Sequence, residues 1–217
     1  MPGNRENEIV IARYEEDISW SNACRDICLI YNKGSKLLGY ESEQVVPLIN
    51  VGRESHSYLY HIINRWAQLA DKTLFTQGNI TEHIGIGIDP RVFFDKRFDF
   101  IIKNARYIKD YDPYAGNLIH WGKWLKDLET GKMRKAKLSF VDWCKEVLKI
   151  DFKGGPIFYG PGATFSVSKE LIYKKPIMFY KHLLSFLEDH SNPEEGHYFE
   201  RTWVYVFCDI STKILTF

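Results

Sequence analysis

The stretch KTLFTQGNITEH, residues 72–83, decides the fold that we expect for this chain. Leu74 and Phe75 have the apolar, β-favouring character of a short strand that runs into a sheet. Gln77-Gly78-Asn79 ends that strand, because Gly and Asn tolerate the backbone angles that break an extended run.

Four polar side chains follow at this strand end: Gln77, Asn79, Glu82 and His83. Ligands of open α/β sheets collect beyond the carboxyl ends of the strands, so the stretch predicts a ligand site at this edge. A polar loop that caps the next element explains the same residues equally well.

Two further short strands are expected before this stretch. Residues 8–12 and 27–31 are apolar, with a helical segment between them, which is the opening of a βαβ unit. The first strand runs into Arg13 and Tyr14, which could meet a phosphate and stack on a base. The alternative there is a solvated turn before an acidic helix start.

The composition is that of an ordinary globular protein. The 217 residues suffice for one well-cored domain or two small ones, with 45% hydrophobic and 26% charged residues. The aromatic share of 15% favours broad contact surfaces or a core rich in rings. A formal net charge of +1 predicts no field that would steer nucleic acid or an anionic membrane.

Three features predict a cytoplasmic protein. No apolar run approaches the ~20 residues that cross a bilayer, so no transmembrane segment is expected. Residues 1–8 are polar and mixed in charge, which argues against a secretory signal. Cys24 and Cys28 stand one helical turn apart without a second pair, so reduced thiols are expected rather than a zinc site or a disulfide framework.

A helix is expected from about residue 54 to 66, where apolar and aromatic residues recur at helical spacing. Asn50-Val51-Gly52 leads into it, so Arg53 lies near the amino end of the helix, where a diphosphate can bind. Glu54 opposes an anion there unless it pairs with Arg53 or binds a sugar hydroxyl. Further helices are expected over residues 140–150 and 178–187.

Two other motifs suggest ligand chemistry. Asp110-Tyr111-Asp112 is the only literal Asp-x-Asp, and its carboxylates could both reach a divalent cation, although Asp112-Pro113 favours a turn. Residues 157–168 predict a strand, a Gly160-Pro161-Gly162 turn and a second strand. Small residues at that turn let backbone amides approach a ligand, and a tight hairpin would need the same glycines.

Four segments together resemble a known family: 9–17 with Trp20, 50–59, 75–79 with His83, and 160–168. It is a family of largely uncharacterised fungal, algal and viral domains. The resemblance is greatest to the amino-terminal glycosyltransferase domain of large chlorella viruses, implicated in glycosylating the major capsid protein. The similarity extends to residues 200–203.

The resemblance implies a single-domain α/β protein of the GT-A fold, with a mixed central sheet flanked by helices. It implies a nucleotide-binding half of about residues 8–90 and a half of about residues 91–217 that binds sugar and acceptor. The implied ligands are a UDP-sugar such as UDP-glucose, Mn²⁺, and a glycan or glycoprotein acceptor. For a viral protein, the implied location is the host-cell cytoplasm.

The resemblance also implies site residues. Gln77-Gly78-Asn79 takes the place of an Asp-x-Asp metal motif, and its neutral amides bind a divalent ion far less strongly than carboxylates. The implied Mn²⁺ ligands are therefore Asn79 with His197 or Glu82, or alternatively Asp110 and Asp112. The implied nucleotide-sugar-binding residues are Ala12, Arg13, Tyr14, Gly52, Arg53, Gln77, Gly78, Asn79, Gly160 and Gly162.

The expected function is transfer of a sugar from a UDP-sugar to a glycan of a viral capsid glycoprotein. Mn²⁺, Arg13 and Arg53 would share the charge of the leaving UDP. Glu200 is the candidate base of an inverting transfer, whereas a retaining transfer would not need a base in that place. The alternatives are a catalytically silent nucleotide- or carbohydrate-binding domain and an interaction module, and no nucleic-acid partner is expected.

Overall fold

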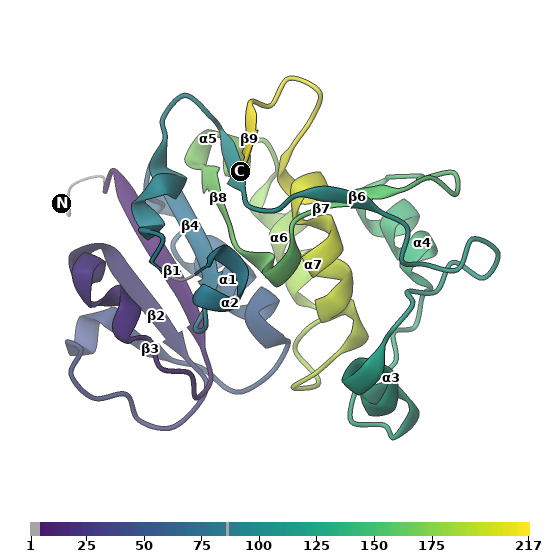
Figure 1. Cartoon of the computed structure of the whole chain (residues 1–217), viewed down its shortest axis with the longest axis horizontal. Coiled ribbons are helices and arrows are strands. Elements are labelled where there is room, and N and C mark those ends of the chain that lie inside the picture. The colour runs from purple at the N-terminus through teal and green to yellow at the C-terminus, as the bar shows by residue number, and fades with distance from the viewer. Residues whose placement is uncertain (1–4, 86) are drawn as a thin grey trace.

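Seven strands form the central sheet in the order β3-β2-β1-β4-β8-β5-β9 (Figure 1). The computed structural model describes residues 5–85 and 87–217. The strands are β1 (Asn7–Arg13), β2 (Cys28–Asn32), β3 (Val45–Pro47), β4 (Lys72–Gln77), β5 (Phe100–Ile102), β8 (Phe165–Ser168) and β9 (Ile214–Thr216). Strands β1 to β4 are parallel, β8 is antiparallel to both β4 and β5, and β9 is parallel to β5. The expected mixed sheet of one α/β domain is confirmed.

Helices cover both faces of this sheet. Along β1 the side chains alternate, so Val10 and Ala12 join one core while Ile9 and Ile11 join the other. The first core is covered by α1 (Arg53–Asn64), α6 (Ile177–Leu184) and α7 (Glu194–Phe207). The second is covered by a 3₁₀ segment (Ser19–Ile27), α2 (Thr81–Ile84) and a 3₁₀ turn (Pro90–Phe94).

The chain between β5 and β8 leaves the sheet and returns to it. This excursion holds β6 (Arg106–Ile108), which pairs with β7 (Ile157–Tyr159) in a small antiparallel sheet. It also holds α3 (Gly122–Glu129) and α4 (Phe140–Trp143), and the short helix α5 (Lys169–Tyr173) follows β8. Figure 1 shows α3 at the lower right, away from the central sheet.

The larger core is built from aromatic rings. Tyr58 of α1 packs on Phe75 of β4 with 5.0 Å between ring centroids, and Phe165 of β8 packs on Trp203 of α7 at 5.3 Å. All four side chains are buried, and each contributes about 2 kcal/mol by leaving water. The high aromatic content therefore serves the core.

The helix expected over residues 140–150 is confirmed over residues 140–148, although not as an α-helix throughout, and the hairpin alternative is wrong. The helix expected over 140–150 is α-helical only to Trp143 and continues as a π-helical turn (Cys144–Leu148), which Lys149 ends with a φ of +62°. The hairpin alternative for residues 157–168 fails because β7 pairs with β6 whereas β8 pairs with β4 and β5. The turn at Gly160-Pro161-Gly162 thus connects two sheets.

Candidate functional site

A cleft opens at the carboxyl end of β1 and β4. From β1 the sheet extends through β2 to β3 on one side and through β4 on the other, so the strand order changes direction between β1 and β4. Such a switch point is where open α/β sheets bind ligands. The cleft has a volume of about 410 Å³, within the range of small-molecule sites. It is lined by Ala12, Arg13, Tyr14, Glu16, Lys33, Asn50, Arg53, Glu54, Gln77, Lys123, Trp124, Asp127, Ser191 and Asn192.

A larger hollow of about 570 Å³ lies at the opposite edge, near the amino end of β1. Its lining includes Arg5, Glu6 and Asn7. Because the strands begin at that edge, the strand-end rule does not apply to it. We therefore place the candidate site in the cleft at the carboxyl edge.

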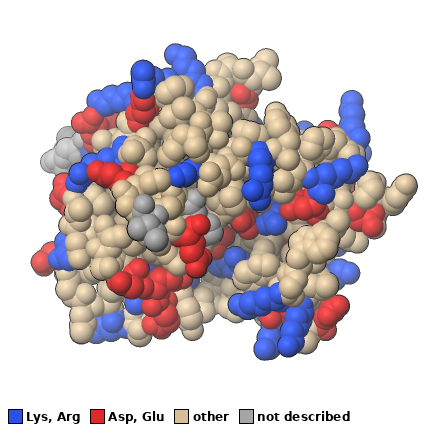
Figure 2. All heavy atoms as spheres, viewed as in Figure 1, with Lys and Arg blue, Asp and Glu red and all other residues tan. Residues whose placement is uncertain are grey.

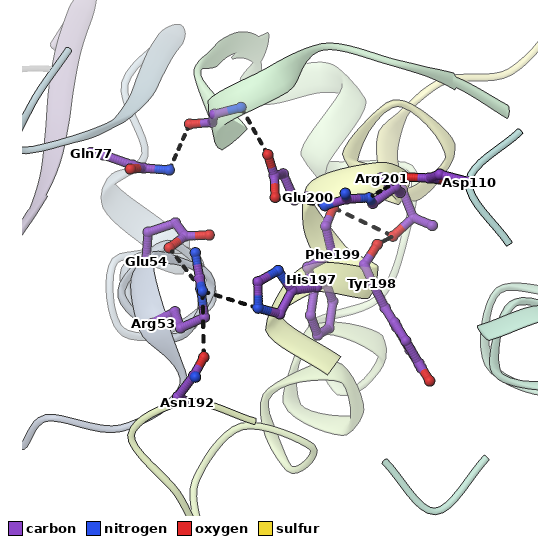
Figure 3. A network of polar contacts seen from close by, with 12 residues as sticks. Arg53, Glu54, Gln77, Asp110, Asn192, His197, Tyr198, Phe199, Glu200 and Arg201 are labelled. Carbon is purple, nitrogen blue, oxygen red and sulfur yellow. Dashed lines mark hydrogen bonds and ion pairs between the residues drawn. The ribbon is translucent and has the colours of Figure 1, made fainter. Parts of the chain in front are cut away.

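Arg53 extends into this cleft from the first position of α1. Its Nη1 lies 3.1 Å from Nε2 of His197 and 3.4 Å from Oδ1 of Asn192 (Figure 3). Its guanidinium carbon lies 4.6 Å from the ring centre of Trp124. The φ of Arg53 is +53°, a left-handed conformation that costs a non-glycine residue about 1–2 kcal/mol. Strain of this kind clusters at functional sites, where the surrounding structure maintains it.

Gly52 makes this entry into α1 possible. Its φ is +62°, and its N–H donates to the carbonyl of His190 at 2.8 Å. A Cβ at this position would lie 2.6 Å from both Cβ and the carbonyl oxygen of Leu187. Only glycine fits both the backbone angle and the space.

Gly52→Ala is therefore expected to lower the free energy of unfolding by about 3 kcal/mol, through a strained φ and an overpacked contact. Gly39→Ala is the matched control, because Gly39 has a φ of +82° but nothing within 4 Å of its added Cβ. Gly39→Ala should lower the free energy of unfolding by about 1 kcal/mol. Urea unfolding of both variants measures the difference, and equal losses would show that the contact with Leu187 does not matter.

Glu54, next to Arg53, is a buried carboxylate of the cleft with one oxygen unpartnered by any described residue. Its side chain is only 8% exposed, and its Oε2 lies 3.5 Å from Nε of Arg53. Its Oε1 is buried and has no hydrogen-bond partner among the described residues, and the same holds for the hydroxyl of Tyr58 one helical turn later. Buried polar atoms without partners are costly, so these two atoms are where a ligand or water would bind.

Lys33, which directly follows β2, holds the loop before α1 in place. Its Nζ donates to the carbonyls of Val51 and Arg53. Burial lowers the pKa of Lys33 to about 7, although the nearby charge of Glu54 acts to raise it. Lys33 was not among the residues predicted for the site, although the strand-end rule could have found it just beyond β2.

Stability should therefore rise with pH between about 7 and 10. In this window the unfolded chain keeps the proton on Lys33 while the folded protein releases it, so the free energy of unfolding gains at most about 1.4 kcal/mol per pH unit. Lys33→Met should remove this part of the slope in urea unfolding. A slope that is identical in the variant would mean that Lys33 stays charged when folded.

Arg13 lines the cleft, but the N–H groups of its guanidinium already donate hydrogen bonds within the protein. Nε donates to the carbonyl of Glu16 at 2.9 Å, and Nη1 donates to Oδ1 of Asn32 at 2.7 Å and to the carbonyl of Tyr14 at 3.1 Å. The side chain is buried, whereas Tyr14 is 51% exposed at the rim. Arg13 thus positions the rim, and Tyr14 offers an open ring.

Of the polar residues predicted at the end of β4, Gln77 lines the cleft. Its Nε2 donates to the carbonyl of Gly162 at 2.9 Å, which ties β4 to the glycine turn. Asn79 instead accepts a hydrogen bond from the hydroxyl of Thr81 at 2.9 Å, and Glu82 is exposed on α2. The side chain of His83 lies outside the described residues.

Gly78 and the glycine turn serve close packing. A Cβ on Gly78 would lie 2.8 Å from Oε2 of Glu16, and one on Gly160 would lie 2.3 Å from Ile102. The N–H of Gly162 donates at 3.0 Å to Oε1 of Glu200, whose Oε2 accepts from Arg201 at 2.7 Å. Both oxygens of Glu200 are therefore engaged, and the amide of Gly162 is turned toward α7.

The predicted metal ligands do not fit Mn²⁺. Nε2 of His197 faces the guanidinium of Arg53, and burial, reinforced by that charge, lowers the pKa of His197. Asp110 is paired with Arg201 at 3.0 Å, and Asp112 accepts the N–H groups of its own turn. Within residues 5–85 and 87–217, no three His, Cys, Asp or Glu side chains are grouped to hold a metal ion.

The opposite wall of the cleft comes from residues that the sequence did not single out. Lys123, Trp124 and Asp127 of α3 and Asn192 before α7 complete the lining. Behind them His120 lies 3.0 Å from Glu194 and packs on the ring of His197 at 5.1 Å. No sequence pattern links these positions to Arg53, because α3 and α7 approach α1 only through the tertiary fold.

The fold and the cleft define the class of protein as an α/β domain with a ligand-sized cleft at the switch point of a mixed sheet. Residues 9–84 match a family model described as "Protein of unknown function (DUF3431)". The matched segment runs from β1 to α2 and contributes Arg53, Glu54 and Gln77 to the cleft. No curated protein matches the chain. No helix among the described residues is long and apolar enough to cross a bilayer.

Proposed function

We propose that this protein is a glycosyltransferase that takes a sugar from a UDP-sugar bound in the cleft. The observation that carries the proposal is Arg53, held in a strained conformation so that its guanidinium enters the cleft beside the buried carboxylate of Glu54. A guanidinium suits a diphosphate, because its planar set of N–H groups matches phosphate oxygens. The acceptor class, a glycan of a viral capsid glycoprotein, comes from the sequence resemblance.

In this proposal, cationic side chains of the protein neutralise the charge of the diphosphate. Arg53 binds it directly, and Lys123 adds positive charge at the same cleft. Tyr14 stacks on the base at the rim. Because the predicted ligands do not fit Mn²⁺, neutralisation of the leaving UDP is assigned to these cations.

Glu54 replaces Glu200 as the proposed base. Its buried Oε1 has no hydrogen-bond partner among the described residues and would take the proton of an acceptor hydroxyl, whereas both oxygens of Glu200 accept hydrogen bonds from N–H donors. Glu54 lies on the Nε side of Arg53, and Asn192 and His197 lie on the Nη1 side. A leaving diphosphate and an acceptor hydroxyl can therefore occupy different sides of Arg53.

A thermal-shift screen of UDP, GDP and CMP, each with EDTA or with Mn²⁺, tests the proposal. A ligand that binds only the folded state raises the melting temperature by mass action. UDP should raise it most, and should do so in EDTA. Equal shifts for all nucleotides would contradict a uridine site. A UDP shift that appears only with Mn²⁺ would mean that a metal ion, rather than these side chains, neutralises the diphosphate.

The second candidate is a catalytically silent nucleotide- or carbohydrate-binding domain. It is favoured by the amides of Gln77-Gly78-Asn79, which stand where the resemblance implies a metal motif. Release of UDP from UDP-glucose separates the two functions. UDP binding without any release of UDP, with or without an acceptor glycan, would support the silent domain.

A further inference from the structure

The segment from His120 to Lys137, which contains α3, is strongly basic. It holds six Lys and Arg against two Asp and Glu, a net charge of +4 in a chain whose formal net charge is +1. Figure 2 shows Lys and Arg gathered at the lower right, where Figure 1 places α3. The small net charge of the whole chain therefore conceals a local positive surface.

The lysines of this segment are exposed and form no ion pairs with described residues, although Nζ of Lys123 lies 4.8 Å from the ring centre of Trp124. Arg134 is held by Glu195 at 2.9 Å and by Asp189 at 3.0 Å, and Asp127 is buried on the cleft side. Five lysines are exposed, and none of them forms an ion pair with any described residue. They are Lys123, Lys126, Lys132, Lys135 and Lys137. Their charge is available to an external anionic surface.

Large apolar side chains protrude among these lysines. Trp121 is 70% exposed and Leu125 is 42% exposed. Trp121 is the residue before α3 and Leu125 lies in the first turn of the helix, so both are exposed at its amino end. An indole and a leucine flanked by lysines are the composition of helices that lie in the interface of an anionic bilayer.

We propose that the α3 surface, formed by Trp121, Leu125 and the five lysines, docks on an anionic lipid bilayer. Lysines suit the diffuse charge of a lipid surface, and Trp121 and Leu125 can enter the boundary between headgroups and acyl chains. A nucleic acid is disfavoured because the one Arg of this segment, the side chain best suited to bidentate contacts with base edges, is paired within the protein.

Docking would place the cleft next to the bilayer. Lys123, Trp124 and Asp127 of α3 also line the cleft, so one face of this helix serves the cleft while Trp121 and Leu125 lie apart from that lining. The proposal does not depend on the glycosyltransferase assignment. It concerns attachment to a surface only.

Vesicle co-sedimentation tests the proposal. The whole protein should bind vesicles of phosphatidylcholine with about 30% phosphatidylserine, fail to bind phosphatidylcholine alone, and be released as salt rises from about 0.1 to 0.5 M. Lys126→Glu/Lys135→Glu should weaken binding by about 30-fold or more. Lys36→Glu/Lys213→Glu carries the same change of charge at exposed lysines elsewhere and should bind like the wild type.

A second pair of variants tests insertion. Trp121→Ser/Leu125→Ser should weaken vesicle binding by about tenfold. Leu38→Ser, at a position 76% exposed outside α3, should have no effect. Equal binding to neutral vesicles, or equal losses in the Lys36/Lys213 control, would overturn the proposal. So would tighter binding of single-stranded DNA that Trp121→Ser/Leu125→Ser leaves unchanged, which would make the α3 surface a nucleic-acid site. Circular dichroism and melting temperatures confirm that each variant folds.

Discussion

Arg53→Asn is expected to bind UDP about 100-fold more weakly than the wild type, because two charge-assisted hydrogen bonds to the diphosphate are lost. Asn tolerates the left-handed conformation that residue 53 adopts at φ +53°, so the entry into α1 should survive. The melting temperature without ligand should also fall, because the contacts of Arg53 with Trp124, with the buried Glu54 carboxylate and with His197 are lost. Isothermal titration with UDP in EDTA measures the affinity.

Two companion variants sharpen this result. Arg53→Lys keeps the charge but loses the planar set of N–H groups, so it should recover only part of the affinity. Arg97→Asn removes an exposed arginine whose partner is Asp95, outside the cleft lining, and should leave binding unchanged. Binding by Arg53→Asn within about threefold of the wild type would refute a diphosphate site at Arg53.

Glu54→Gln is expected to reduce sugar transfer from UDP-glucose by about 10²- to 10⁴-fold in kcat, the range for loss of a general base. The amide keeps the shape of the side chain, so the fold and the affinity for UDP should be retained. Release of UDP in the presence of an acceptor glycan measures kcat, and titration with UDP measures the affinity.

Glu200→Gln is the matched comparison. The carboxylate of Glu200 holds the N–H of Gly162 and the side chain of Arg201, so its loss should act mainly on stability and on KM. A larger loss of kcat in Glu200→Gln than in Glu54→Gln, with UDP affinity intact in both, would return the role of base to Glu200. Unchanged kcat in both variants would exclude both Glu54 and Glu200 as the base.

Much of the fold could be predicted from local patterns. Strands β1, β2 and β4 are short apolar runs that end in polar or glycine-containing turns, and α1 follows a regular helical spacing. The end of α4 could not be predicted, because residues 140–150 have helical periodicity on both sides of the point where the backbone changes to a π turn. The position of β8 in the sheet could not be predicted either, because Phe165 pairs with Phe75, 90 residues earlier in the chain.

In the candidate site too, some residues could be predicted from local sequence signals and others could not. Gln77 and Arg53 follow recognisable local signals, a strand end and a helix start, and the cleft includes both. Asn79 carries the same local signal as Gln77, but it turns to Thr81 instead. Trp124 has no local signal at all, because an amphipathic helix shows which side chains it exposes but not which cavity they face.

The sequence by itself determined the class of fold and the edge of the sheet at which a ligand site would lie, because strand ends and helix starts depend on residues next to one another. Only the tertiary structure decided which side chains meet there. Arg53 reaches Asn192 and His197, 139 and 144 residues further along the chain, whereas Glu54 keeps an oxygen unpartnered in the described part of the chain and Glu200 is engaged by Gly162 and Arg201. Contacts over such separations depend on how α1, α3 and α7 pack together, and periodicity along the chain carries no information about that packing.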